Sequence, residues 1–112
     1  VVSNDPQNSF IRQIAEAYHI PAARLTAFYA TPNTGQNYVL EWNGETAADG
    51  TLLRSADTLR RCFLIDENGN LDSVAATDPD ERENMSRVEN TFAMQTLIKG
   101  VILPKVLEQI ES

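Results

Sequence analysis

Apolar residues recur at helical spacing near the start of the chain. Asp5-Pro6 suits a helix N-cap followed by proline at the first helical position, and apolar residues then repeat every three or four positions between residues 10 and 18. Pro21 disfavours helical geometry at the residue before it. We therefore expect an amphipathic helix that begins at Asp5-Pro6 and ends at about His19.

The pattern changes to that of a sheet in the middle of the chain. Residues 38–42, Tyr-Val-Leu-Glu-Trp, favour a strand, and Asn43-Gly44 directly behind them is a strong signal for a tight hairpin. Asp49-Gly50 marks a further turn. Residues 25–31 fit either a strand or a helix, so this segment leaves the number of strands open.

Residues 59–65 form the clearest strand of the pattern. The apolar side chains of residues 62–65 point alternately to both faces, which is typical of a strand in the interior of a sheet. The polar residues 66–70 predict a turn, after which residues 71–77 should return antiparallel.

A second helical pattern occupies the last third of the chain. Asp78-Pro79 fits an N-cap followed by proline, and acidic residues follow in the first turn. Most later apolar residues share one side of this helix, but Met94, Leu97 and Val101 point to the opposite side. Because a helix that is apolar on two sides is buried on two sides, we predict that the sheet covers one side and that Met94, Leu97 and Val101 form an interaction surface.

Pro104 interrupts this last helix. Proline removes a backbone hydrogen bond to Gly100 and clashes with the preceding turn, so we predict a bend at residues 100–103. Pro104 should then start a short terminal helix that reaches about Glu111.

Together these elements predict one α+β domain over residues 1–112. It consists of an N-terminal helix, a three- to four-stranded antiparallel sheet, and a long kinked C-terminal helix packed on the sheet. A length of 112 residues with 42% hydrophobic and 22% charged residues is typical of a single globular domain. No apolar run approaches the length of a membrane span, so membrane insertion is not expected.

The charge of the chain is strongly acidic and unevenly distributed. The formal net charge is −7, and residues 66–90 hold eight acids against two arginines. Such a surface repels phosphates, so we expect no nucleic acid partner. It fits a basic protein partner, or it serves solubility alone.

Residues that could carry chemistry are few. His19 is the only histidine, which excludes a site built from several histidines, and its place at a helix end suits a favourable contact with the helix dipole. The sequence contains no serine elbow, no phosphate-binding glycine loop and no paired cysteines. We therefore expect no cofactor, no metal site and no catalytic set.

The single cysteine bears on the compartment. Cys62 lies in an apolar run, where a small buried and inert thiol is expected, and it cannot form an internal disulfide. The lack of disulfides slightly favours a cytoplasmic location and leaves an exported mature domain open. Because the chain begins Val1-Val2-Ser3 without methionine, we expect a processed or trimmed product.

Five of the eight aromatic residues lie between residues 18 and 42. Such a cluster forms one corner of a core or a platform for a small ligand or glycan. Tyr29, Tyr38 and Trp42 are the candidates for the platform, since Trp42 beside a hairpin turn could stand partly exposed.

Residues 14–25 are similar to the helical corner of two families. One is the DNA-binding helix-turn-helix, and this resemblance implies a second helix from Pro21 towards Tyr29. The other is the LysM glycan-binding module, which is similar in its Ile-Ala-x-x-Tyr-x-Ile-x-x-x-x-Leu pattern. This second resemblance implies that Asn33 corresponds to the asparagine that follows the pattern in LysM. The first 32 residues hold only two arginines against two acids, and the Tyr-x-Val-x-x-Gly-Asp-x-Leu opening of LysM is absent. We assign the chain to neither family.

The sequence favours a small acidic protein-interaction module, such as an adaptor, an immunity or chaperone-like protein, or a subunit of an assembly. Its partner is a protein, and a second copy of the chain is one candidate, because a two-fold dimer would cover the predicted apolar surface. A domain that binds a small ligand or glycan through the aromatic cluster is the alternative. A small hydrolase is the third interpretation, since some pair of the many carboxylates could share a cleft.

Overall fold

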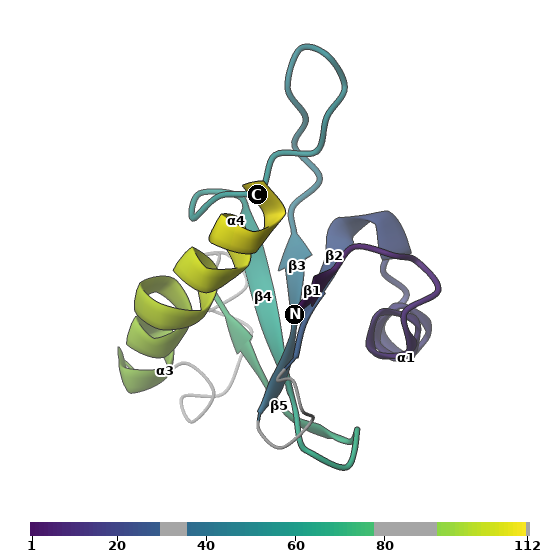
Figure 1. Cartoon of the computed structure of the whole chain (residues 1–112), viewed down its shortest axis with the longest axis vertical. Coiled ribbons are helices and arrows are strands. Elements are labelled where there is room, and N and C mark those ends of the chain that lie inside the picture. The colour runs from purple at the N-terminus through teal and green to yellow at the C-terminus, as the bar shows by residue number, and fades with distance from the viewer. Residues whose placement is uncertain (30–35, 78–91, 112) are drawn as a thin grey trace.

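The computed structural model describes residues 1–29, 36–77 and 92–111 of the chain. Within these ranges the fold is α+β, with a five-stranded antiparallel sheet, an N-terminal helix and a C-terminal helical segment (Figure 1). The predicted class is confirmed, although the sheet has one strand more than expected. The strands are β1 (Val2–Ser3), β2 (Leu25–Phe28), β3 (Asn37–Trp42), β4 (Leu59–Ile65) and β5 (Leu71–Ala76), and the helices are α1 (Ser9–Tyr18), α3 (Phe92–Leu97) and α4 (Leu103–Glu111).

The strands follow one another in the sheet in chain order, from β1 to β5, and each pair is antiparallel. The extra strand is β1, which pairs with the end of β2 through only two residues. Tyr29 N–H donates to the Val1 carbonyl at 2.9 Å and extends this short pairing. A two-residue strand has no alternating pattern of its own, so the sequence could not predict it.

The sheet carries an apolar core on each face. Alternate positions of β4 divide between the two, as predicted: Cys62 and Leu64 face the C-terminal helical segment, whereas Phe63 and Ile65 face α1. Residues 98–106 supply the helical side of the first cluster, and Ile11 and Ile14 of α1 supply that of the second. The three layers are therefore helix, sheet and helix.

Helix α1 begins later than the sequence indicates. The predicted start at Asp5-Pro6 is wrong, because the side chain of Asn8 caps the helix and accepts hydrogen bonds from the backbone N–H groups of Phe10 and Ile11. Asp5 instead holds a preceding turn, in which its carboxylate accepts from the backbone of Gln7 at 2.9 Å. The end at His19 is confirmed, where the chain turns with φ of +57°.

After α1, residues 22–24 form one short 3-10 turn (η1, Ala22–Arg24) that leads directly into β2. The ambiguous segment is thus a strand over residues 25–28. Where a helix-turn-helix would continue with its second helix, the chain enters the sheet.

The connection between β3 and β4 differs from the tight hairpin expected at Asn43-Gly44. Residues 43–58 separate the two strands, and Asn43-Gly44 lies at the base of this connection rather than at its tip. Gly44 does adopt a φ of +93°, which favours glycine. The turn forms at Asp49-Gly50 instead, as the second turn signal predicts. The hairpin between residues 66 and 70 has the expected position.

The C-terminal segment is helical with a local irregularity. A π-helical turn (η2, Ile98–Ile102) joins α3 to α4, and Leu103 N–H donates to the carbonyl of Ile98, five residues back. Since Pro104 has no N–H for Gly100, a wider turn at this point accommodates it. A π turn thus lies at the position of the predicted bend, while the bend itself stays a prediction. Helix α4 begins at Leu103, one residue before the predicted start at Pro104, and ends at Glu111 as expected. The predicted helix start at Asp78-Pro79 lies outside the described residues.

Among the described residues, no helix has the length and apolarity needed to cross a membrane.

Candidate functional site

The structure places the three residues of the predicted apolar surface in different environments. Val101 is 44% exposed and lies in the π turn. Leu97 is half-buried and packs against the core on the helical side of the sheet. The side chain of Met94 lies outside the described part of the chain. Within the described residues, Val101 is therefore the member of this set that solvent reaches most.

The three residues of the predicted aromatic platform do not form one exposed surface. Trp42 is 0% exposed, and its indole Nε1–H donates to the Thr26 hydroxyl at 2.9 Å. Tyr38 packs against the same core cluster as Trp42, whereas Tyr29 packs against the cluster on the α1 face, with its ring centroid 5.9 Å from that of Phe10. The expected exposure of Trp42 is wrong, because residue 42 continues the inward-facing positions of β3 rather than flanking a tight turn.

A projecting hairpin, residues 45–53, is the most prominent surface feature. Figure 1 shows the connection between β3 and β4 standing clear of the sheet and helices. Leu53 N–H donates to the Glu45 carbonyl and Ala47 N–H to the Thr51 carbonyl, at 2.9 and 2.8 Å. These bonds pair the two limbs of the hairpin, and its tip turns at Asp49-Gly50. The extension is therefore ordered by its own backbone.

A polar pocket of about 410 Å³ lies at the base of this hairpin. We call it the hairpin-base pocket. Its buried residues are Leu59 and Thr77, and its exposed charged residues are Glu45, Asp57 and Lys99. Asn43 and Ala56 complete the described lining. Strand ends, the hairpin and the C-terminal helical segment thus all contribute to one depression.

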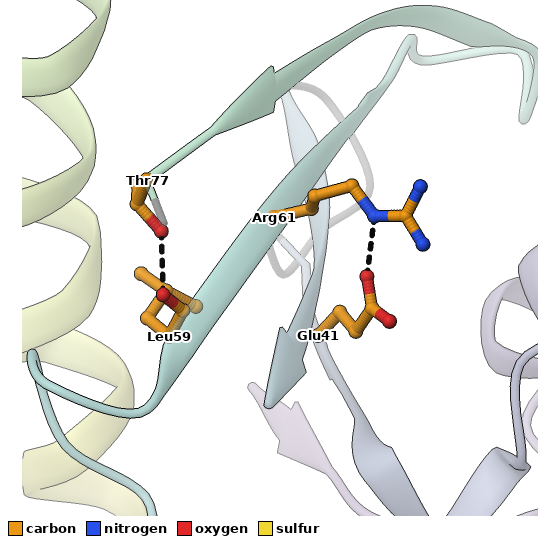
Figure 2. A network of polar contacts seen from close by, with 4 residues as sticks. All are labelled: Glu41, Leu59, Arg61 and Thr77. Carbon is orange, nitrogen blue, oxygen red and sulfur yellow. Dashed lines mark hydrogen bonds and ion pairs between the residues drawn. The ribbon is translucent and has the colours of Figure 1, made fainter. Parts of the chain in front are cut away.

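Hydrogen bonds hold the walls of the pocket in place. Asn43 N–H donates to the Thr58 carbonyl at 2.8 Å and joins the two limbs below the hairpin. The Thr77 hydroxyl donates to the Leu59 carbonyl at 2.8 Å and fixes the end of β5 against the start of β4 (Figure 2). Gln95 of α3 donates from its amide to the Ala76 carbonyl, which ties the helix to the same strand end. The pocket is therefore built on fixed elements.

The charged residues of the hairpin and of the pocket form no ion pair within the described part of the chain. The ion pairs among the described residues are Arg12–Glu16 on α1 and Arg61–Glu41 on the sheet, so Glu45, Asp57 and Lys99 lie outside both. Hydrogen bonds from Thr51 lower the pKa of Asp49, which keeps its carboxylate ionised at the hairpin tip.

Two arginines belong to or contact the connection between β3 and β4, and neither forms an ion pair among the described residues. Arg54, on the returning limb, is partly withdrawn from solvent, and this burial lowers its pKa. The guanidinium of Arg24 lies against Gly44, where a Cβ would come within 2.8 Å of it. The exposed charged residues on the hairpin and its returning limb are thus carboxylates: Glu45, Asp49 and Asp57.

The described lining of the pocket does not have the donor set of a metal site. Two carboxylates belong to that lining, and in the described ranges no group of three or more histidine, cysteine or acidic side chains could hold a metal ion. His19, the single histidine, is exposed at the end of α1.

A second polar cluster lies on the α1 face of the sheet. Arg61 Nε and Glu41 Oε1 are 2.5 Å apart, and Glu41 is only 4% exposed (Figure 2). The Arg61 guanidinium also lies 5.8 Å from the centroid of the Tyr18 ring and 5.4 Å from that of Phe63. Because both charged groups are engaged and largely buried, this cluster stabilises the packing of α1 on the sheet.

Cys62 is fully buried, and burial raises the pKa of its thiol from 9.0 to about 12. Above pH 9 the unfolded chain therefore loses the thiol proton while the native protein keeps it, so stability falls as the pH rises from 9 towards 12. The loss is on the order of 1 kcal/mol per pH unit. Urea denaturation of the native protein and Cys62→Ala between pH 8 and 11 measures it, and we expect the steeper decline in the native protein.

Tyr38 shares part of this pH dependence, since burial and the nearby Cys62 raise the pKa of its phenol. Cys62→Ala keeps Tyr38 and its burial, so the difference between the two slopes reports the thiol together with its effect on Tyr38. Equal slopes would contradict the prediction.

Sequence reasoning did not identify the hairpin-base pocket. The available signals were the two turn dipeptides Asn43-Gly44 and Asp49-Gly50. The short segment between them could form one limb of a separate hairpin that turns at Asp49-Gly50. Lys99 and Thr77 reach the pocket only through tertiary packing. Comparisons of the chain with protein-family models, with curated protein sequences and with solved structures found no match.

Proposed function

We propose that this protein is a protein-interaction module that binds a basic partner through the projecting hairpin. The observation that carries the proposal is the hairpin itself, which extends away from the body and is ordered by its own hydrogen bonds. An ordered extension presents side chains at a low conformational cost on binding.

The chemistry of the hairpin favours a basic partner. Glu45, Asp49 and Asp57 are exposed carboxylates, and Leu53 is a 39% exposed apolar side chain beside them. Carboxylates around an apolar contact complement a surface that carries lysine or arginine. The net charge of −7 adds long-range attraction for such a partner.

The proposal is tested with fluorescent peptides of equal length that carry either six basic residues or none. We expect the basic peptide to bind the protein in fluorescence anisotropy. The affinity should fall between 20 and 150 mM salt, because the added salt shortens the Debye length to about 8 Å. Glu45→Lys/Asp49→Lys should weaken binding about tenfold or more, because each change replaces attraction by repulsion.

The matched control is Glu67→Lys/Asp72→Lys, which makes the same change in net charge at exposed positions around the turn between β4 and β5. If binding depends on the hairpin, this control retains most of the affinity. Equal losses in the two variants would show a nonspecific attraction to an acidic protein and overturn the proposal.

A second copy of the chain is the other candidate partner, and the exposure of Val101 favours it. Burial of Val101 in a two-fold interface would stabilise a dimer. Sedimentation velocity on the native protein and Val101→Lys separates the two cases: a dimer that the substitution dissociates supports self-association through the helix, whereas a monomer at high concentration contradicts it.

A further inference from the structure

We infer that the hairpin-base pocket receives one cationic side chain, a lysine or an arginine, of the basic partner. This inference rests on the proposed function and specifies where the partner makes its central contact. The pocket and the hairpin share Glu45, so a partner that lies along the hairpin reaches the pocket without a separate interface.

The lining of the pocket suits a long side chain with a charged end. The exposed Ala56 offers apolar surface for a methylene stem, while Glu45 and Asp57 offer carboxylates for an ammonium or guanidinium group. Neither carboxylate belongs to an ion pair among the described residues. A cationic group there gains two charge partners and displaces none.

The two carboxylates come from opposite limbs of the connection between β3 and β4. Glu45 begins the outgoing limb and Asp57 ends the returning limb, and the bond from Asn43 N–H to the Thr58 carbonyl holds these limbs together. The Asn43 side chain accepts from Glu45 N–H at 2.9 Å, which orients the backbone at the first of them. Both carboxylates of the described lining are therefore carried on fixed backbone.

The charge of Lys99 distinguishes a cationic ligand of the pocket from an anionic one. It is the single basic residue in the described lining, and it opposes a cationic ligand while attracting an anionic one. Replacement of Lys99 by methionine keeps the stem and removes the charge. It should tighten binding of a cation and weaken binding of an anion or a zwitterion.

The probes are N-acetyl-arginine N-methylamide, its lysine counterpart and its citrulline counterpart, which replaces the guanidinium by a neutral urea of the same shape. Each is titrated into the full ¹⁵N-labelled chain at low salt and followed by backbone amide chemical shifts. We expect the arginine and lysine probes to shift the amides of Asn43, Glu45, Asp57, Thr77 and Lys99. The citrulline probe should leave them unchanged.

The variants test the assignment to the pocket. Asp57→Asn and Glu45→Gln should each weaken the cationic probes about two- to fivefold, the range for exposed charge pairs. Glu67→Gln is the matched control, because it removes the same charge from the exposed turn between β4 and β5, away from the described pocket lining, and should leave the affinity unchanged. Lys99→Met should strengthen binding by a similar factor.

Shifts spread over the whole acidic surface, equal effects of citrulline and arginine, or weaker binding to Lys99→Met would each overturn the inference. If the probes fail while the basic peptide still binds in a hairpin-dependent manner, the pocket assignment fails and the proposed function stands. If the peptide also fails to distinguish the hairpin variant from its control, both fail.

Discussion

Trp42→Ala is expected to destabilise the protein by about 3–5 kcal/mol, which is a large part of the stability of a domain of this size. Trp42 is the largest fully buried side chain of the described core. Its ring packs in the cluster between the sheet and the C-terminal helical segment, with Leu40, Leu59 and Ile102 as members of the same cluster. Truncation leaves a cavity that strands on one side and a helix on the other cannot easily fill.

Part of this loss comes from a hydrogen bond rather than from packing. The indole of Trp42 donates to the Thr26 hydroxyl, and both residues are 0% exposed. Trp42→Phe removes the donor and keeps much of the ring, so it should cost less than Trp42→Ala. Thr26→Val leaves the indole N–H unpaired and should cost about 1–3 kcal/mol.

Urea denaturation followed by far-ultraviolet circular dichroism measures all three variants, since Trp42 is the only tryptophan and its fluorescence is lost with the substitution. Unchanged stability of Trp42→Ala would contradict the placement of this residue. The same result would revive an exposed aromatic platform.

The sequence predicted most reliably those elements whose signals are local and consistent. The alternation in residues 62–65 assigned each side chain to a face of β4, and both core clusters agree with it. The turn after β4 was equally clear, because the Asp66 side chain accepts hydrogen bonds from the backbone of Asn68 and Asn70 and thereby closes it.

Competing local signals were harder to resolve. Asp5 and Asn8 are both good caps, and Asn8 prevails because the helix that it starts places Ile11 and Ile14 against the sheet. Asn43-Gly44 and Asp49-Gly50 are both good turns, and pairing of Trp42 with Leu59 leaves only the second at a tip. In each case tertiary packing decided between alternatives of similar local preference.

The candidate site lay beyond the sequence pattern for a different reason. Glu45, Asp57, Thr77 and Lys99 come from separate elements, and no spacing in the chain relates them. The predicted aromatic platform failed for the opposite reason, because nearness in sequence did not bring its residues onto one surface. Its aromatics are close in sequence, but Tyr29 and Trp42 belong to core clusters on opposite faces of the sheet. Aromatic residues in or next to the strands of a sheet usually pack in its core, so their clustering in sequence does not imply a shared surface.

Arg61→Met is expected to destabilise the protein by about 3–5 kcal/mol, because it leaves the Glu41 carboxylate buried without its charge partner. Glu41 is 4% exposed on the α1 face of the sheet. There the contact with Arg61 Nε takes the place of the water that would hydrate the carboxylate. Methionine keeps the length of the stem, so the change isolates the guanidinium. The rings of Tyr18 and Phe63 also lose a cation, which adds a smaller cost of about 0.5–1 kcal/mol.

The reverse truncation and the double variant separate pairing from burial. Glu41→Gln should cost less than Arg61→Met, since the side chain of Arg61 is 18% exposed and retains some access to water, whereas that of Glu41 is 6% exposed. Glu41→Gln/Arg61→Met removes both charges and should recover much of the stability that Arg61→Met loses. Urea denaturation of the four proteins at pH 7 gives the coupling free energy directly. A double variant as unstable as the sum of the single changes would show that the pair contributes no coupling, and that Arg61 acts through its ring contacts and packing instead.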